Sequence, residues 1–338
     1  MNSVFPKQYL GHRYAAIALF LLGLVTGLSS AFAEPSVRVI TDIAPIQSLV
    51  WRVMDGVGEP AVLIRPGTSP HHYSLRPSDA KVLQDAEVIF FVGSGLTPWL
   101  EPRLPVLAPD ARRIELSSVA GIVTLKYRSK ALFEEERSPE AHDSEHTEGH
   151  GSDGSEDNEH NHAHPTDGID PHLWLDPQNA RIWITAIAEV LSKVDPKNAD
   201  RYRQNAVSAA FEISALTDQI RSDLEGLETQ GFIVFHDAYQ YWERRFGFTA
   251  RGALLSADAS TPSPKRLMQL RQLVDRGDAI CVLSEPQFDP GLIHSVFAAG
   301  SVKVGLLDPE GVRRTPGPHL YRELLKDIAD EVKRCLSP

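Results

Sequence analysis

Three histidines stand at places in the sequence where their side chains could meet a metal ion. His71 lies a few residues beyond an apolar run typical of a strand, His236 directly follows a second such run, and His172 precedes a helical segment. Imidazole is a common zinc ligand, and three of them suit zinc better than manganese or magnesium, which prefer oxygen. Taken alone, each histidine is more simply explained as an ordinary surface or core residue. The surrounding sequence must therefore show whether the three are metal ligands.

The chain has 13 histidines, and those in the body of the chain beyond these three have no comparable setting. His72 adjoins His71, but neighbouring side chains in an extended segment point in opposite directions, so only one of the two should face a metal. His294 lies in a helical pattern and His319 in a turn rich in proline and glycine, so neither is assigned a role.

Six further histidines lie in an acidic insert between the first two candidate ligands. From Glu134 to Asp170 there are 13 acidic residues and one basic residue, so this segment has a net charge of −12. The whole chain has a net charge of −11, so the rest of the chain sums to +1. The stretch 138–168 is low in complexity and has almost nothing to bury, so it should be a disordered loop. We expect it to bind zinc weakly; the alternative is a solvated loop without function. Its histidines are His142, His146, His150, His160, His162 and His164.

The N-terminus has the layout of a secretory signal peptide. Lys7 and Arg13 supply positive charge, residues 14–28 form an uncharged and mostly apolar run, and Ala31-Phe32-Ala33 is a small-x-small cleavage site. A membrane anchor is the alternative, but the run is shorter than the ~20 residues that a spanning helix needs. Cleavage after Ala33 and a periplasmic mature protein are therefore expected.

Length, composition and charge narrow the class of protein. At 338 residues the chain is long enough for two domains, and its 42% hydrophobic content is enough for packed cores. The net negative charge argues against nucleic-acid binding. Two cysteines, Cys281 and Cys335, remain after export, which permits one disulfide worth roughly 4 kcal/mol; the alternative is two free buried thiols.

Strand and helix patterns alternate in both halves of the mature chain, which predicts an α/β fold with two lobes. Each lobe should hold a mainly parallel four-stranded sheet flanked by helices. In such open sheets ligands bind beyond the carboxyl ends of the strands, where His71 and His236 would lie. The expected strands are Val37–Thr41, Ala61–Ile64, Val88–Val92, Arg113–Leu116, Phe232–Phe235, Ala253–Leu255, Ile280–Leu283 and Val302–Leu306.

A long helical stretch separates the two halves. The segment Asp200–Leu227 keeps a helical apolar period and would reach about 40 Å. One rigid helix joining two lobes would limit wide hinge motion.

In the first half, Ser78 is expected to cap a helix over Asp79–Ala86. The expected layout is a signal peptide (1–33), an N-terminal lobe with the insert (34–195), a linking helix (198–228) and a C-terminal lobe (229–338).

The segments around the candidate ligands resemble those of a known family, the metal-binding proteins of ABC importers in their zinc branch (ZnuA-like). The resemblance covers nearly the whole mature chain, and its motifs are specific in combination. The matching segments are Ser69–Asp79, Asp170–Pro177, Phe235–Tyr239, Ser284–Phe288 and Leu307–Pro309.

The resemblance implies two lobes, each with a parallel sheet, a metal between them, and His71, His172 and His236 as zinc ligands. The manganese branch has a carboxylate where this chain has His236, which favours zinc. Some zinc-branch members have a glutamate where this chain has Pro70, so the fourth ligand is expected to be Asp308 or water. The cysteines stand where the zinc branch places its disulfide.

The function implied is a monomeric periplasmic receptor that captures Zn²⁺ between two lobes and delivers it to the permease of a zinc-uptake ABC transporter. One alternative is a manganese-binding receptor or adhesin of the same fold. A zinc hydrolase is the other alternative, because three histidines and an open position also hold catalytic zinc. The sequence has no His-Glu-x-x-His motif and no nucleophile elbow, so no enzymatic activity is expected.

Overall fold

The computed structural model describes Met1 and residues 37–128, 132–133, 168–298 and 300–337. The expected signal peptide, with its cleavage site after Ala33, and the six histidines of the insert lie outside the described residues. All of the elements below belong to one compact unit, Val37–Pro338.

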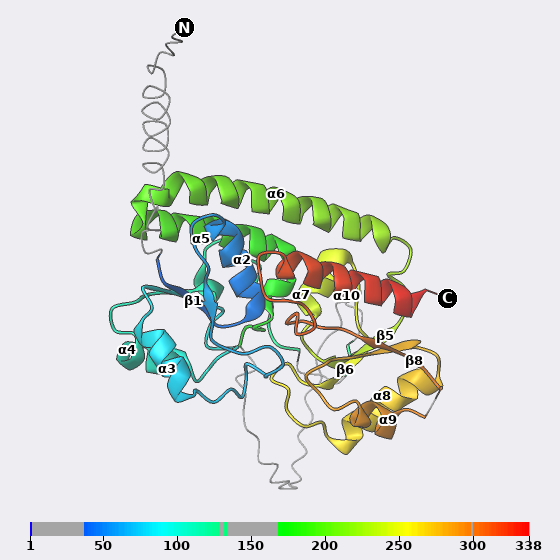
Figure 1. Ribbon diagram of the computed structural model, residues 1–338. Helices are drawn as coiled ribbons and strands as arrows, with labels where there is room; N and C mark the ends of the chain where they lie inside the picture. Colours follow the sequence, from blue (N-terminus) through cyan, green and yellow to red (C-terminus); the bar gives the residue numbers. More distant parts are fainter. Residues whose placement is uncertain (2–36, 129–131, 134–167, 299, 338) are drawn as a thin grey trace, which may run out of the picture. The chain divides into compact units, whose positions relative to one another are not determined.

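Two four-stranded sheets, each entirely parallel, form the framework (Figure 1). Their strand orders, β2-β1-β3-β4 and β6-β5-β7-β8, are equivalent, so the two halves repeat one architecture. The predicted α/β class with two parallel four-stranded sheets is confirmed. The strands are β1 (Val39–Thr41), β2 (Ala61–Val62), β3 (Val88–Phe91), β4 (Arg112–Glu115), β5 (Phe232–His236), β6 (Gly252–Leu255), β7 (Cys281–Ser284) and β8 (Lys303–Leu306).

Helices cover both faces of the sheets. Figure 1 shows α2, α5, α6 and α10 on one side and α3, α4, α8 and α9 on the other. The helices are α2 (Ala44–Met54), α3 (Pro77–Gln84), α4 (Leu104–Leu107), α5 (Pro177–Val194), α6 (Ala199–Asp223), α7 (Gln240–Phe246), α8 (Pro264–Asp275), α9 (Gly291–Val296) and α10 (Leu320–Leu336). None of these helices, in the described part of the chain, combines the length and apolar character that a membrane span requires.

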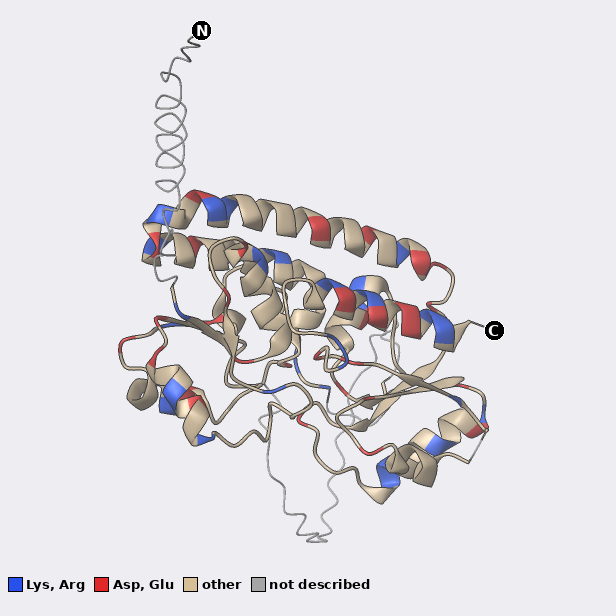
Figure 2. Cartoon of the chain, viewed as in Figure 1, with Lys and Arg blue, Asp and Glu red and all other residues tan. Residues whose placement is uncertain are grey.

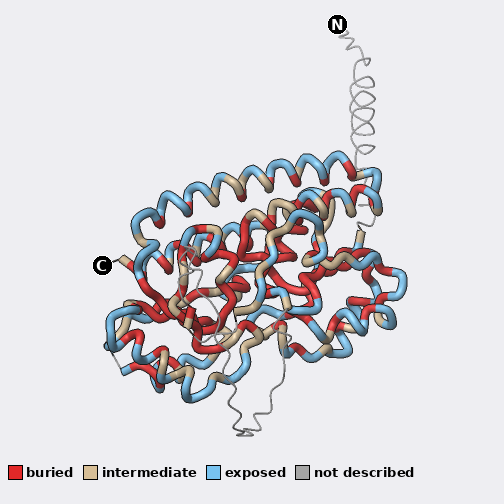
Figure 3. The backbone as a smooth tube through the Cα atoms, turned by 180° about the vertical axis from the view of Figure 1, so that it is seen from behind, coloured by how far each residue is buried: buried red, intermediate tan, exposed pale blue. Residues whose placement is uncertain are grey.

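The central strands divide their side chains between two apolar layers, because successive residues of a strand point to opposite faces. In β5, Phe232 and Val234 pack in a core that both halves share, whereas Ile233 and Phe235 pack in a separate core beneath α8 and α9. The side chains of β3 are divided in the same way between the shared core and a third core beneath α3 and α4. Figure 3 shows this buried interior and the exposed outer side of the helical layer. The end of β5, which carries His236, is therefore held from both faces.

The long helix α6 has 25 residues, about 38 Å of helix, and packs against α5, α2 and α10. It ends four residues earlier than predicted, and Gly226 just beyond it takes a left-handed φ of 85°, a conformation that stops helices. Charged residues of both signs alternate along α6 and α10, which makes their outer faces well solvated (Figure 2).

The C-terminal helix α10 contacts both halves. The Tyr321 N–H donates to Ser48 Oγ on α2 at 3.0 Å, and the Tyr321 hydroxyl donates to the Trp174 carbonyl at 2.7 Å. At its far end, Cys335 forms the predicted disulfide with Cys281 of β7, with the two Cα atoms 5.9 Å apart. This disulfide fixes α10 to the second sheet.

The predicted N-cap of α3 is wrong. The helix begins at Pro77 with Arg76 as its N-cap residue, so Ser78 lies within the first turn. The Asp79 carboxylate accepts the Arg76 N–H at 2.8 Å and also the Tyr73 hydroxyl at 2.7 Å. Proline at the first helical position explains the earlier start, since its ring presets the helical φ.

Candidate metal site

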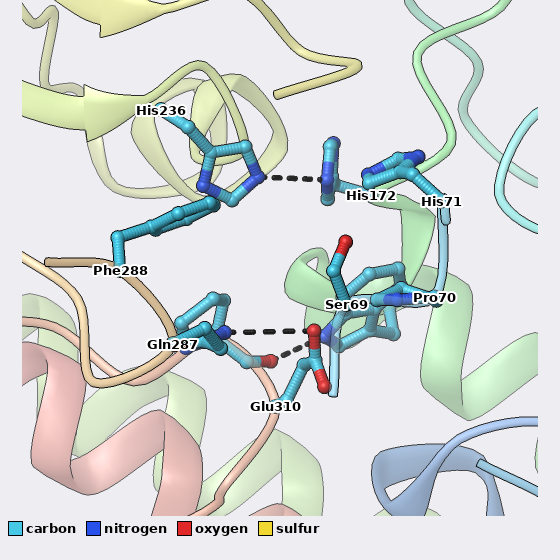
Figure 4. Close-up of a pocket in the computed structure, with 10 residues that line it drawn as sticks. Ser69, Pro70, His71, His172, His236, Gln287, Phe288 and Glu310 are labelled. Atoms are coloured by element: carbon cyan, nitrogen blue, oxygen red, sulfur yellow. Dashed lines mark hydrogen bonds between the residues drawn. The ribbon is translucent and has the colours of Figure 1, made fainter. Parts of the chain in front are cut away.

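The structure brings the three predicted histidines together. One ring nitrogen from each of His71, His172 and His236 lies within 4.8 Å of the others. Within the described part of the chain, these three residues form the one cluster of metal-ligating side chains close enough to hold an ion. The ring centroids of His71 and His172 are 5.5 Å apart, and those of His172 and His236 are 5.0 Å apart. Figure 4 shows the rings side by side, although they come from three distant chain segments.

His236 is the last residue of β5, and a carboxylate from the neighbouring strand's end orients it. The strands β5 and β7 run parallel, so the loop after β7 places Glu285 beside the end of β5. Glu285 Oε1 lies 2.7 Å from His236 Nδ1. The Phe288 ring, 5.5 Å from the His236 ring between centroids, packs against its side.

His172 lies in the segment that leads from the insert to α5, and Asp170 orients it. Asp170 Oδ1 accepts the His172 main-chain N–H at 2.9 Å and lies 2.7 Å from His172 Nδ1. The Asp170 carboxylate is itself held by Gln240 Nε2 at 2.5 Å, and the Asp170 carbonyl accepts the Tyr241 hydroxyl at 2.9 Å. Burial raises the pKa of Asp170 to about 6, against the hydrogen bonds from His172 and Gln240 that act to lower it.

His71 comes from the loop between β2 and α3. Trp99 Nε1 donates to the Pro70 carbonyl at 2.8 Å, which fixes the main chain just before the ligand. The side chain of His71 is half-buried, whereas His72 is exposed. The prediction that only one of the two neighbours faces the site agrees with this placement.

The hydrogen-bonding pattern defines which ring nitrogens are free. An ionised carboxylate only accepts hydrogen bonds, so the Nδ1 atoms of His172 and His236 carry the hydrogens and their Nε2 atoms carry lone pairs. These two Nε2 atoms lie 3.2 Å apart. Two nitrogens bound to one tetrahedral zinc at about 2.05 Å would be about 3.3 Å apart. The pair is therefore spaced for a shared cation.

Burial sets the charge state of the cluster. Burial, and then the neighbouring histidines, lower the pKa of His71 and of His172 well below the usual value, so both are neutral at pH 7. Burial also acts to lower the pKa of His236, but the nearby carboxylates, Glu285 first and then Asp237 and Glu310, together raise it. Without a metal, a proton on His236 Nε2 can bridge to His172; a bound cation would replace it.

The sequence pattern of one protein family, described as the zinc-uptake complex component A, periplasmic, matches residues 39–335. The chain belongs to this zinc-uptake family.

Relatives in the zinc-uptake family align over most of their length. The high-affinity zinc uptake system protein ZnuA of Paracoccus denitrificans is 40% identical over 300 residues, 88% of this chain and 91% of that protein. ZnuA of Brucella suis is 36% identical over 344 residues, 96% and 98% of the two chains. A crystal structure of ZnuA superimposes with a TM-score of 0.70 at 22% identity, covering 90% of this chain and 100% of that one, which shows the shared fold.

In this member of the zinc-uptake family, the structure does not bring the expected fourth ligand, Asp308, into the histidine group. The Asp308 carboxylate accepts the main-chain N–H groups of Val312 and Arg313 at 3.0 and 2.9 Å, so it closes a turn instead. The sequence shows an Asp-Pro pair at positions 308 and 309, but it does not show this turn. The sequence alone therefore could not tell whether the Asp308 carboxylate faces the metal or the turn.

A carboxylate that sequence reasoning missed lines the cavity beside the histidines. Glu310, two residues beyond Asp308, borders a space of about 10 Å³ together with all three histidines (Figure 4). Gln287 Nε2 lies 3.5 Å from Glu310 Oε1, at the limit of a hydrogen bond, and Gln287 Oε1 has no partner. Burial raises the pKa of Glu310 to about 8. The one sequence feature that could have pointed to Glu310 is its position directly after the Asp308-Pro309 pair.

Proposed function

We propose that the protein captures Zn²⁺ with His71, His172 and His236 between its two parallel sheets and delivers the ion to the permease of a zinc-uptake ABC transporter. The observation that carries this proposal is the pair of facing Nε2 atoms of His172 and His236, 3.2 Å apart, with His71 beside them. Membership of the zinc-uptake family supports the same cargo. The signal peptide, cleaved after Ala33, would export the protein, which acts as a monomer in the periplasm.

Zinc is favoured over manganese because the protein offers neutral nitrogen donors. The three imidazoles suit borderline-soft zinc, whereas manganese prefers carboxylate oxygen. His236 is the residue that decides this preference, because the manganese branch has a carboxylate at this position.

The fourth donor to the ion is Glu310. Its carboxylate borders the cavity, and its hydrogen-bond partner within the described part of the chain is Gln287, at the long distance of 3.5 Å. Asp308 is already engaged with two main-chain N–H groups. Glu310, like Asp308, lies outside the group formed by the three histidines, so its side chain would have to rotate to bring an oxygen to the ion.

The size of the site favours a receptor over a hydrolase. A space of about 10 Å³ between the ligands has room for about one water molecule or ion, not for an organic substrate at the metal. A cavity of about 1130 Å³ beyond the ends of β3 and β4 reaches His71 and the exposed His72. It offers a path by which an ion enters.

The insert has an accessory role in this proposal. Its six histidines and many carboxylates bind zinc weakly and raise the local concentration of the ion, as the composition of 138–168 suggests. The tight site does not depend on it, because all three core ligands lie in other segments.

Metal analysis and chelator competition on the mature protein, with and without residues 138–165, test the proposed function. We expect one tightly bound zinc per chain in both proteins and the loss of weaker additional binding after deletion. A deletion protein without its tightest site would contradict the assignment, and so would hydrolysis of ester, amide or phosphate substrates by the zinc-loaded protein.

A further inference from the structure

Arg128 reaches from the segment before the insert to the residue that follows a zinc ligand. Its Nε donates to both oxygens of the Asp237 carboxylate, at 2.9 and 3.1 Å, and its Nη2 also contacts Asp237 Oδ1. Asp237 is fully buried and directly follows His236. The two partners are 109 residues apart in the chain.

A second buried carboxylate completes the binding of the Arg128 guanidinium. On α7, the Glu243 oxygens accept from Nη1 at 2.9 Å and from Nη2 at 3.0 Å. Glu243 Oε2 also accepts the Ala250 N–H at 3.0 Å, just before β6. The ring of Phe133 lies 3.7 Å from the guanidinium carbon. All three nitrogens of the guanidinium are therefore committed, which fixes its plane.

The main chain before Arg128 is anchored beside the second ligand. The Leu125 carbonyl accepts the Asp170 N–H at 2.8 Å, and the Leu125 N–H donates to the Tyr241 hydroxyl at 2.9 Å. Gln240 Nε2 donates both to the Lys126 carbonyl and to the Asp170 carboxylate. The segment that carries Arg128 is thus built into the support of Asp170, which orients His172.

We infer that Arg128 is a positioning residue for the zinc site, holding His236 in register with His172 through Asp237. The planar fork of arginine binds two carboxylates with defined geometry, which the single ammonium of lysine cannot reproduce. A ligand must be held to within about 0.5 Å for a metal site to keep its geometry. This inference rests on the zinc site proposed above.

Geometry and charge make opposite predictions for the loss of Arg128. The guanidinium repels a cation, so its removal would strengthen zinc binding if charge alone mattered. If Arg128 acts by positioning, its removal weakens zinc binding, and lysine does not restore it although the charge is kept.

The test compares zinc affinity, by chelator competition, in wild type, Arg128→Lys, Arg128→Gln and Arg52→Lys. Arg52 is the matched control, because its side chain has the same 19% exposure and pairs with Glu212 of α6. The visible spectrum of the Co²⁺-loaded protein reports ligand geometry, and thermal unfolding of the metal-free protein reports stability separately. Asp237→Asn, which keeps the side-chain size, serves as a second variant if an Arg128 variant does not fold.

Both Arg128 variants should bind zinc at least about tenfold more weakly, the scale seen when support around a metal ligand is lost, and should shift the Co²⁺ bands. Asp237→Asn should change the zinc affinity and the Co²⁺ bands in the same direction as the Arg128 variants. Arg52→Lys should change neither the affinity nor the bands. Wild-type affinity and spectrum in Arg128→Lys, or tighter binding in Arg128→Gln, would overturn the inference. Absence of tight zinc binding in wild type would instead overturn the proposed function.

Discussion

The Nε2 atoms of His172 and His236 face each other at 3.2 Å, while a carboxylate holds the Nδ1 of each ring. Asp170 and Glu285 thereby fix the tautomer that leaves both lone pairs free. Two lone pairs at this distance are stable only with a cation or a proton between them. The site is thus built for a cation before one arrives, and proton and metal compete for the same place.

Replacing any one ligand by alanine should remove tight zinc binding. Loss of a group that only orients a ligand costs roughly 10–100-fold in affinity, and loss of the ligand itself should cost at least that. The variants are His71→Ala, His172→Ala and His236→Ala, measured by competition with a chelator. His72→Ala is the control, since its exposed side chain should not contribute. Unchanged affinity in all three ligand variants would disprove the assignment.

Glu285→Gln should change both the affinity and its pH dependence. The Glu285 carboxylate raises the pKa of His236 above 6.5 against the opposing effect of burial. Zinc must displace the proton of His236, and this lowers the affinity, by up to about tenfold per pH unit, as the pH drops through that raised pKa. Loss of the Glu310 proton, whose pKa is raised to about 8, adds a separate dependence on pH. Without the carboxylate, burial dominates and the fall begins at lower pH. At neutral pH the variant should bind roughly 10–100-fold more weakly because its ring is less well held.

Zinc titrations of wild type and Glu285→Gln between pH 5 and pH 8 would measure both effects. Glu212→Gln, a partly exposed carboxylate on α6, is the control and should follow the wild-type profile. Identical profiles for all three proteins would mean that Glu285 does not act on the ligand.

Glu310→Gln and Asp308→Asn should separate two candidate oxygen donors. If Glu310 completes the ligand set, its amide variant should bind zinc about tenfold more weakly, because an amide cannot give up a proton to become a carboxylate donor when the ion binds. Asp308→Asn should leave the affinity unchanged and lower the unfolding free energy by about 1 kcal/mol, since one main-chain N–H loses its partner. Chelator competition and thermal unfolding would measure both effects in both variants. Weaker zinc binding in Asp308→Asn, with unchanged binding in Glu310→Gln, would identify Asp308 as the fourth ligand.

His236→Glu should lower the preference for zinc over manganese. The change replaces a neutral nitrogen donor by a charged oxygen donor at the end of β5, and manganese favours oxygen. Zinc can remain the tighter ion, because the intrinsic order of affinities places manganese lowest. The expected result is therefore a smaller ratio of the two affinities in competition titrations. A ratio that does not move would mean that position 236 does not contact the ion.

The sequence predicted the fold class and the three converging histidines because both depend on local patterns. Apolar runs of strand length alternate with helical periods, and parallel strands carry His236 and Glu285 to the same edge. The family motifs then distinguished these three candidate ligands from histidines such as His294.

Side-chain contacts between distant segments that neither a local pattern nor a family motif marks could not be predicted. Arg128 lies in a stretch without clear periodicity, and its partners are more than a hundred residues away. Asp308 was expected as a possible ligand because it matches a carboxylate ligand position in related branches of the family, whereas the turn that its carboxylate closes depends on the three-dimensional structure. Likewise, Ser78 has good capping chemistry, but Pro77 begins the helix before it.

The coordination of zinc in the loaded mature protein tests the central claim most directly. A crystal structure of the zinc complex, or X-ray absorption at the zinc edge, would give the number and kind of ligands. We predict one zinc with the Nε2 atoms of His172 and His236 and a ring nitrogen of His71 at about 2.0–2.1 Å, completed by one oxygen. A zinc bound elsewhere, with these three histidines free of metal, would contradict it.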